Sequence, residues 1–168
     1  MLLNVVCPLM LLYTYYELAI QNWASSGTNQ TTYLIHGLWP QNENGEYPSW
    51  CNGTAYYPVS GSLEQEMQTY WNAGDDNQNF WGHEWNKHGT CTQAQAGLDE
   101  GAYFQQAITL FRDFEGPSCP AGEDTCIHSC YDLDFNPRTC GPQNRDIPDW
   151  GPRKTHIFRD DRSVIRAL

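Results

Sequence analysis

Seven cysteines constrain this chain of 168 residues more than any other feature of its sequence. A reduced cytosolic protein seldom carries so many, and their irregular spacing does not form the paired CxxC knuckles of a zinc site. We therefore expect disulfide bonds and a route through the secretory pathway. The cysteines lie at positions 7, 51, 91, 119, 126, 130 and 140.

Two further features agree with a secretory route. Residues 2–12 are apolar apart from Asn4 and resemble the hydrophobic core of a signal peptide, although a basic start and a small-residue cleavage site are missing. We expect a signal segment at 1–14, too short to span a bilayer, whose removal would take Cys7 away and leave six cysteines. Asn29 and Asn52 each begin an N-glycosylation sequon.

The composition fits one domain but argues against a general nucleic-acid-binding surface. The chain is 40% hydrophobic, which suffices for a single core, and no repeat or linker divides it. Its formal net charge is −11, whereas proteins that bind the phosphates of nucleic acids usually have a basic surface. This argument weakens in an acidic compartment, where carboxylates partly protonate and histidines gain charge. A hydrolytic enzyme also needs positive charge only in its cleft.

The pattern of apolar residues predicts both strands and helices. Alternating polarity predicts strands at 16–20 and 33–39, the second of them stopped by Pro40 and followed by a loop as far as Gly61. A capping box of Ser62 and Gln65 starts a helix that ends at Gly74. The remaining elements are a helix at 80–88 that stops at Gly89, a helix at 102–114, and short strands near 127–133 and 155–158.

Residues 80–91 (FWGHEWNKHGTC) place two histidines, a glutamate and a lysine within six positions of one expected helix. Glu84 and His88 are four apart and share a helix face, as do His83 and Lys87. The sequence therefore predicts that these polar groups point together.

Two other interpretations of this cluster are weaker. A solvated helix face would seldom carry two histidines beside Trp81 and Trp85, which form a separate apolar stripe that anchors the helix to the core. A zinc site of the zincin type needs histidines four apart, whereas His83 and His88 are five apart and turned roughly 140° from each other on an α-helix.

A third histidine, His36, lies in the otherwise apolar strand at 33–39, where a lone histidine is more often a core residue than a catalyst. Its neighbours reverse that interpretation. Residues 36–40 (HGLWP) and 81–91 (WGHEWNKHGTC) together resemble the two active-site signatures of the ribonuclease T2 family, which are acid endoribonucleases. The order and separation of the two motifs also fit, and the resemblance extends from about residue 15 to residue 158.

The resemblance implies an α+β fold, with an antiparallel sheet flanked by helices and stapled by disulfides. It also implies that His88 takes the proton of the RNA 2′-hydroxyl and His36 protonates the leaving 5′-oxygen. The two roles are exchanged when water opens the 2′,3′-cyclic phosphate. Because RNA carries its own nucleophile, we expect no metal and no cofactor. The residues alone leave open which histidine is the base.

The resemblance assigns the neighbouring charged residues to the phosphate. Lys87 and protonated His83 would stabilise the charge of the transition state. Glu84 would act catalytically, either by donating a hydrogen bond to the phosphate when protonated or by orienting His88.

Two aromatic residues are expected to bind bases. Trp39 corresponds to a base-stacking residue of the family and Phe80 to an aromatic of a second base site, although each ring could equally belong to the core. Gln41 stands where base-recognising members often have Asp, so the base preference stays open.

The resemblance also implies disulfide pairings and shows where the chain departs from the family. The catalytic domain, 15–168, is shortened after Phe114 by a few tens of residues, including a helix. Cys119 and Cys126 are left to pair with each other. The implied bridges join Cys51 to Cys91 and Cys130 to Cys140.

We therefore expect a monomer, secreted or in the lysosome or vacuole, that cleaves single-stranded RNA at acidic pH and needs no protein partner or membrane span. Two other classes of function compete with this. An inactive relative that binds or stores is disfavoured by the intact catalytic residues. A disulfide-stapled module that binds glycans through Trp and Tyr would leave the histidine pair unexplained.

Overall fold

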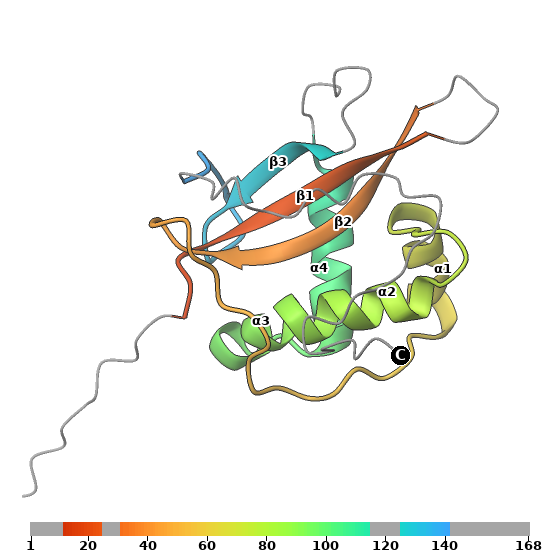
Figure 1. Cartoon of the computed structure of the whole chain (residues 1–168), viewed down its shortest axis with the longest axis horizontal. Helices are drawn as coiled ribbons and strands as arrows, with labels where there is room; N and C mark the ends of the chain where they lie inside the picture. The colour runs from red at the N-terminus through yellow and green to blue at the C-terminus, as the bar shows by residue number, and fades with distance from the viewer. Residues whose placement is uncertain (1–11, 25–30, 115–124, 142–168) are drawn as a thin grey trace, which may run out of the picture.

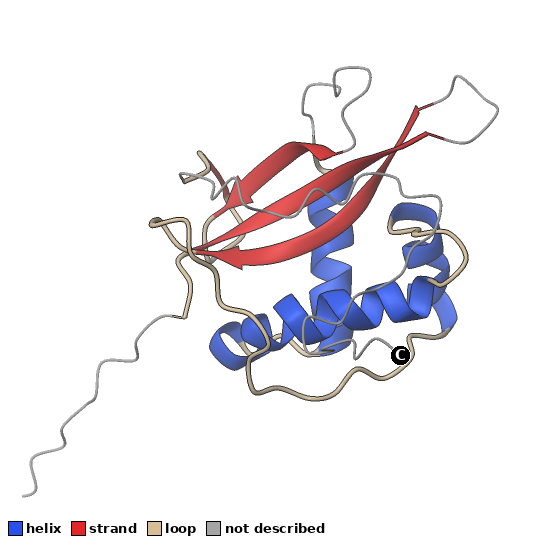
Figure 2. Ribbon diagram, in the orientation of Figure 1, coloured by secondary structure: helices blue, strands red, loops and turns tan. Residues whose placement is uncertain are grey.

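The computed structural model describes residues 12–24, 31–114 and 125–141, and it confirms the expected α+β fold (Figures 1 and 2). The strands form one antiparallel sheet in the order β2-β1-β3-β4 and are β1 (Tyr15–Ala24), β2 (Thr31–Gln41), β3 (Thr125–Tyr131) and β4 (Pro137–Arg138). The helical elements are α1 (Gly61–Tyr70), α2 (Asn77–Glu84), the π-helical turn η1 (Trp85–Gly89), α3 (Thr90–Ala96) and α4 (Glu100–Arg112).

The hairpin of β1 and β2 is longer than the sequence pattern predicts. We expected Pro40 to stop the second strand, but β2 continues through Pro40, which pairs with Tyr16, to Gln41. Proline lacks the N–H that a central strand must donate, and β2 tolerates it because β2 is an edge strand of the sheet.

A β-bulge interrupts this hairpin at His36. Ala19 pairs with Gly37 and the next residue, Ile20, pairs with Ile35, so His36 is the extra residue of the bulge on β2. Such a bulge bends the strand and changes the direction of a side chain. The position of His36 at the sheet edge is therefore set by an irregularity of the backbone.

The helix that was expected at 80–88 is part of a longer run. Asp76 caps its N-terminus by accepting a hydrogen bond from the Asn79 N–H. The prediction that Gly89 ends it is wrong, because Gly89 keeps helical dihedrals and the helix continues as α3 to Ala96. A Cβ on Gly89 would lie 2.2 Å from the ring of Trp85, so this glycine allows close packing rather than a stop.

Helix α1 also differs from its prediction. Its N-cap is Ser60, and no side chain makes a capping hydrogen bond there, so the expected capping box of Ser62 and Gln65 does not form. The helix ends at Tyr70, before the expected Gly74. It ends there because Trp71 leaves the helical conformation, with φ at −134°, and its side chain enters the core.

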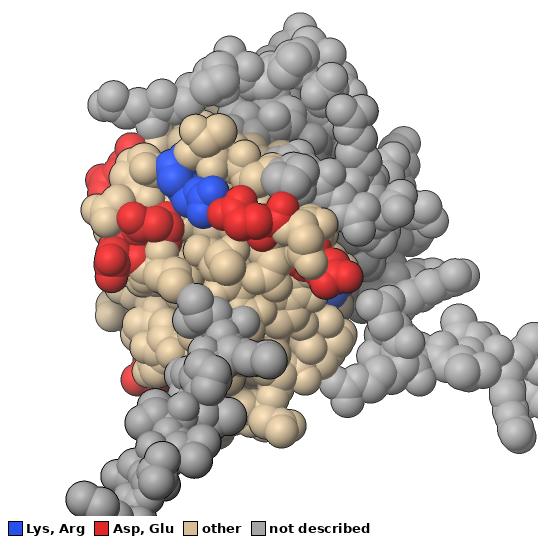
Figure 3. Space-filling view, turned by 90° about the vertical axis from the view of Figure 1, so that its left-hand side faces the viewer, with Lys and Arg blue, Asp and Glu red and all other residues tan. Residues whose placement is uncertain are grey.

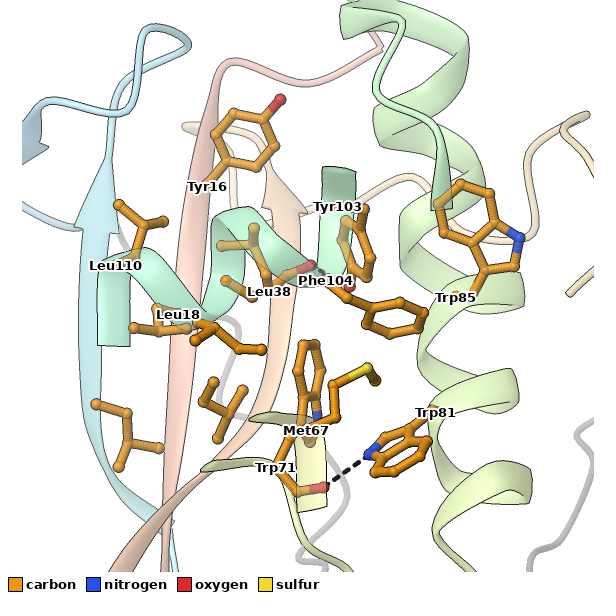
Figure 4. Close-up of a cluster of buried hydrophobic side chains, with 14 of the residues drawn as sticks. Tyr16, Leu18, Leu38, Met67, Trp71, Trp81, Trp85, Tyr103, Phe104 and Leu110 are labelled. Carbon is orange, nitrogen blue, oxygen red and sulfur yellow. Dashed lines mark hydrogen bonds between the residues drawn. The ribbon is translucent and has the colours of Figure 1, made fainter. Parts of the chain in front are cut away.

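The core lies between the sheet and the helices and is rich in aromatic rings (Figure 4). Helix α4 begins at the cap Asp99, whose side chain accepts from the Ala102 N–H. Of the apolar face expected for this helix, Phe111 is only half-buried. The side chains of the core that are fully buried include Tyr16, Leu18, Ile20, Trp71, Trp81, Trp85, Tyr103 and Phe104.

The start of the described chain packs into the core. Tyr13, which falls within the expected signal segment, is a core residue and shares a hydrogen bond with the hydroxyl of Tyr16. The strand expected at 155–158 lies outside the described residues. None of the helices in the described part of the chain is long and apolar enough to cross a membrane.

Candidate active site

His36 enters the site from the bulge of β2. Its backbone carbonyl accepts a hydrogen bond of 2.8 Å from the indole of Trp71, which ties the bulge to the core. Its ring meets Trp39 edge-on at 5.4 Å and Phe80 at 5.6 Å between centroids. The histidine is only 7% exposed, so these contacts define its orientation.

His88 enters the site from the π-helical turn. The carbonyl of Trp85 accepts from the N–H of Thr90, five residues on, and this wider turn surrounds His88. Its ring stacks on Trp39 with 5.4 Å between centroids. Burial lowers the pKa of His88 well below its ordinary value of 6.5, and the charges of nearby Lys87, His83 and His36 lower it further. Burial therefore favours the neutral imidazole at His88.

Glu84 is 2% exposed and contacts Trp39, the indole that the rings of His36 and His88 also touch. Its Oε2 accepts a hydrogen bond of 2.9 Å from the Trp39 indole. Burial raises the pKa of Glu84 to about 7, while the Trp39 hydrogen bond and the charge of Lys87 act in the opposite direction. The carboxyl group can therefore carry a proton under mildly acidic conditions.

Gly37 is a site residue that the sequence analysis missed. A Cβ at this position would lie 2.1 Å from Nε1 of Trp39 and 2.2 Å from Oε2 of Glu84. A side chain would therefore displace the bond between these two groups. The signal was visible as the glycine of the HGLWP motif, but only the structure shows what approaches it.

His83 and Lys87 are half-buried at the margin of this group. The ring of His83 meets Trp50 edge-on at 5.7 Å, and the carbonyl of Lys87 accepts from the Trp50 N–H at 2.9 Å. Both charges act on His88. The prediction that the polar residues of this segment gather is confirmed, and the loop around Trp50 supports them from outside.

The expected anchoring stripe of Trp81 and Trp85 is confirmed. Both rings are fully buried, and the Trp81 N–H donates to the carbonyl of Trp71 at 2.7 Å (Figure 4). The Trp85 N–H donates to the carbonyl of Thr54 at 2.8 Å. The polar face of the helix is thus held toward β2.

The two aromatic residues expected to bind bases lie in the wall of the site. Trp39 is 6% and Phe80 7% exposed, and both touch His36. Tyr47, which the sequence analysis did not single out, is 38% exposed and has its ring centroid 6.1 Å from that of His88. A partly exposed aromatic ring thus lies beside His88.

Two disulfides confirm two of the expected pairings. Cys51–Cys91, with 4.9 Å between Cα atoms, fixes the loop after β2 to α3, and Cys130–Cys140 joins β3 to the segment after β4. Cys119 and the side chain of Cys126 lie outside what the structure describes, so their pairing stays a prediction.

The remaining expectations concern modification, metal and charge. Asn52 is exposed in the described loop, whereas Asn29 lies outside the described residues. Within residues 12–24, 31–114 and 125–141, no three His, Cys, Asp or Glu side chains are grouped so as to hold a metal ion. On the face in Figure 3, the basic side chains lie directly beside acidic ones. At the candidate site, Lys87 places a positive charge that acts on both His88 and Glu84.

Several known proteins resemble this chain in sequence and in fold. Extracellular ribonuclease LE of Solanum lycopersicum is 34% identical over 120 residues, which cover 66% of this chain and 51% of the relative. Ribonuclease MC1 from bitter gourd seeds has a similar structure, with a TM-score of 0.51 at 30% identity over 61% of this chain and 59% of the other. The self-incompatibility-associated SF11-RNase of Nicotiana alata shares the fold, with a TM-score of 0.63 at 18% identity over 83% of this chain and 96% of the other.

The chain spans about half the length of the curated relatives that it matches, for example 44% of ribonuclease M of Aspergillus phoenicis. The model of the Ribonuclease T2 family matches residues 6–119, which include both histidine motifs. The chain therefore belongs to the ribonuclease T2 family.

Proposed function

We propose that this protein is an endoribonuclease that cleaves single-stranded RNA through a 2′,3′-cyclic phosphate to 3′-phosphate ends. The observation that carries the proposal is the arrangement of His36 and His88 around Trp39, each with 5.4 Å between its ring and the indole, beside a protonatable Glu84. Transesterification of RNA needs a base and an acid close together, and this arrangement supplies both.

His88 is the base of the first step. A general base must be neutral before it accepts a proton, and burial among positive neighbours keeps the pKa of His88 low. It removes the proton from the 2′-hydroxyl, whose oxygen attacks the phosphorus. His36 gives its proton to the departing 5′-oxygen. In the second step His36 takes a proton from water, and His88 returns its proton to the 2′-oxygen.

The negative charge of the transition state is stabilised by groups of the same helical run. Lys87 and protonated His83 contribute positive charge, and protonated Glu84 donates a hydrogen bond to a phosphoryl oxygen. Preorganised donors of this kind contribute about 3 kcal/mol each when water is excluded. Because Glu84 loses its proton above about pH 7, this reaction is faster under acidic conditions. No step requires a metal ion or cofactor, since the substrate provides the nucleophile.

Base binding involves three aromatic rings in this proposal. Tyr47 offers a partly exposed ring beside His88, and stacking on one aromatic side chain contributes about 1–3 kcal/mol. Trp39 and Phe80 shape the floor of the two base sites where they touch His36.

The disulfides support a proposal for the cellular location of the enzyme. Two disulfides favour an oxidising environment, so we propose secretion or a lysosomal or vacuolar location, with Asn29 and Asn52 glycosylated and a leader within 1–14 removed. RNA is the partner of the monomeric domain, 15–168.

The test is release of acid-soluble nucleotides from yeast RNA between pH 4 and 8 with excess EDTA. We expect activity in the wild type and a loss of at least a hundredfold in both His36→Ala and His88→Ala, because each removes one proton transfer. Tyr57→Ala, which alters a side chain that is 80% exposed, is the matched control and should stay active. A folded wild type without activity would instead indicate an inactive relative that binds or stores.

A further inference from the structure

Glu17, which is buried, and His128, which is half-buried, form a pair that the proposed reaction does not use. Glu17 lies on β1 and is 1% exposed, and its carboxylate is hydrogen-bonded to Nδ1 of His128 on β3. A buried carboxylate is costly unless it is paired, so the position of each residue depends on the other.

The pair lies against Trp39. Glu17 is directly opposite Trp39 in the register of β1 and β2, so their side chains are neighbours on one face of the sheet. The ring of His128 is tilted against the indole, with 6.4 Å between centroids. The same indole stacks on His88 and donates its N–H to Glu84. Trp39 therefore connects this pair with the site.

We propose that Glu17 and His128 are positioning residues that hold the Trp39 indole in place and thereby keep its N–H on Glu84. A side wall made of a flat, hydrogen-bonded imidazole restricts how far the indole can turn. The N–H then stays directed at the carboxyl group. The catalytic consequence rests on the proposed ribonuclease function, whereas the placement of Trp39 does not.

Loosening Trp39 would change the protonation of Glu84. The hydrogen bond from Trp39 favours the ionised carboxylate, so its loss moves the pKa of Glu84 upward. The other groups that face Glu84 are Lys87 of η1, whose charge also favours the carboxylate, and Tyr103 of α4, whose pKa the Glu84 charge helps to raise. Lys87 and Tyr103 lie on η1 and α4, whereas the pair lies on β1 and β3.

The experiment uses two variants and a matched control in the full chain. His128→Asn retains an amide that can donate to Glu17 but removes the ring from Trp39. Glu17→Gln retains the shape and removes the charge. Glu43→Gln is the control, because it removes a carboxylate from a surface pair with Arg138 at 2.7 Å, whereas the carboxylate of Glu17 is buried.

The first measurement is independent of catalysis. In protein with ¹⁵N-labelled tryptophan, the Trp39 indole signal, assigned with Trp39→Phe, should follow the titration of Glu84 with a midpoint near pH 7. In His128→Asn and Glu17→Gln we expect a higher midpoint and an indole N–H that exchanges at least tenfold faster. Glu43→Gln should match the wild type.

The second measurement is RNA cleavage. We expect kcat to fall about tenfold in both variants, with KM changed less than twofold and the alkaline limb of the pH profile moved to higher pH. An unchanged indole titration in either folded variant would overturn the proposal, and His128→Asn decides alone should Glu17→Gln not fold. Altered indole behaviour in a chain that never cleaves RNA would support the positioning role and refute the ribonuclease function.

Discussion

Each of the two site histidines is followed by a glycine, yet the two glycines make room for different neighbours. Gly37 on the sheet side admits the polar contact between Trp39 and Glu84, whereas Gly89 on the helix side admits the core indole of Trp85. The same dipeptide therefore serves the chemistry of the site in one region and the packing of the core in the other. Sequence identity between two motifs does not establish that their residues have the same role.

The two regions are alike in another respect. Each histidine lies where one extra residue interrupts the regular backbone, His36 at a β-bulge and His88 in a π-helical turn. Such interruptions are frequent at functional sites because they change the direction of a side chain without ending its element. The sheet side is further fixed by the bond from Trp71 to the His36 carbonyl, whereas Nδ1 of His88 has no hydrogen-bond partner among the described residues.

Of the three substitutions considered for the site, Gly37→Ala should lower activity the most. The new methyl group would overlap with Nε1 of Trp39 and Oε2 of Glu84, so both groups must move. A displacement of about 1 Å at such a site can cost a hundredfold in rate. We expect kcat/KM for RNA to fall about a hundredfold while the folded fraction changes little, as measured by cleavage assays and near-ultraviolet circular dichroism. A variant with full activity would show that the close approach at Gly37 does not matter.

Glu84→Gln tests the protonation of the carboxyl group that approaches Gly37. Between its ordinary value of 4.5 and about 7, folded Glu84 holds a proton that the unfolded chain releases. The free energy of unfolding contributed by Glu84 therefore decreases as pH rises through this window. Gln carries no charge, so the variant should gain about 2–3 kcal/mol relative to wild type at pH 8 and nothing at pH 4.

Urea unfolding of both proteins at a series of pH values measures this difference. His88 contributes with the opposite sign, because its lowered pKa favours the folded state above pH 6.5 and is lost in acid, and it acts equally in both proteins. A constant difference across the series would mean that Glu84 is not buried as a protonated acid.

Gly89→Ala should have the smallest effect on the reaction and act on stability instead. Its methyl group would overlap with the Trp85 ring, and such overpacking costs about 1–3 kcal/mol. We expect the free energy of unfolding to fall by about 2 kcal/mol in urea titrations, with kcat per folded molecule altered less than tenfold. An inactive Gly89→Ala variant of full stability would show that Gly89, like Gly37, serves the reaction rather than the packing of the core.

Most of the site could be predicted from the sequence because its chemistry is local. One short segment carries His83, Glu84, Lys87 and His88. Their close spacing in the sequence identifies the second histidine motif. What the sequence did not predict was contributed across the fold: Tyr47 beside His88, and Glu17 with His128 beside Trp39. These residues lie in no motif, and strands and loops distant in the chain bring them together.

The class of fold, the two histidine motifs, the tryptophan anchors and the pairing of Cys51 with Cys91 could all be predicted from the sequence. These depend on residue types, spacing and resemblance. Only the tertiary structure decided that Pro40 stays within a strand, that Gly89 continues a helix and that His36 and His88 lie at backbone irregularities. Local preference for a turn or a stop amounts to about 1–3 kcal/mol per residue, and burial of a few large rings exceeds it.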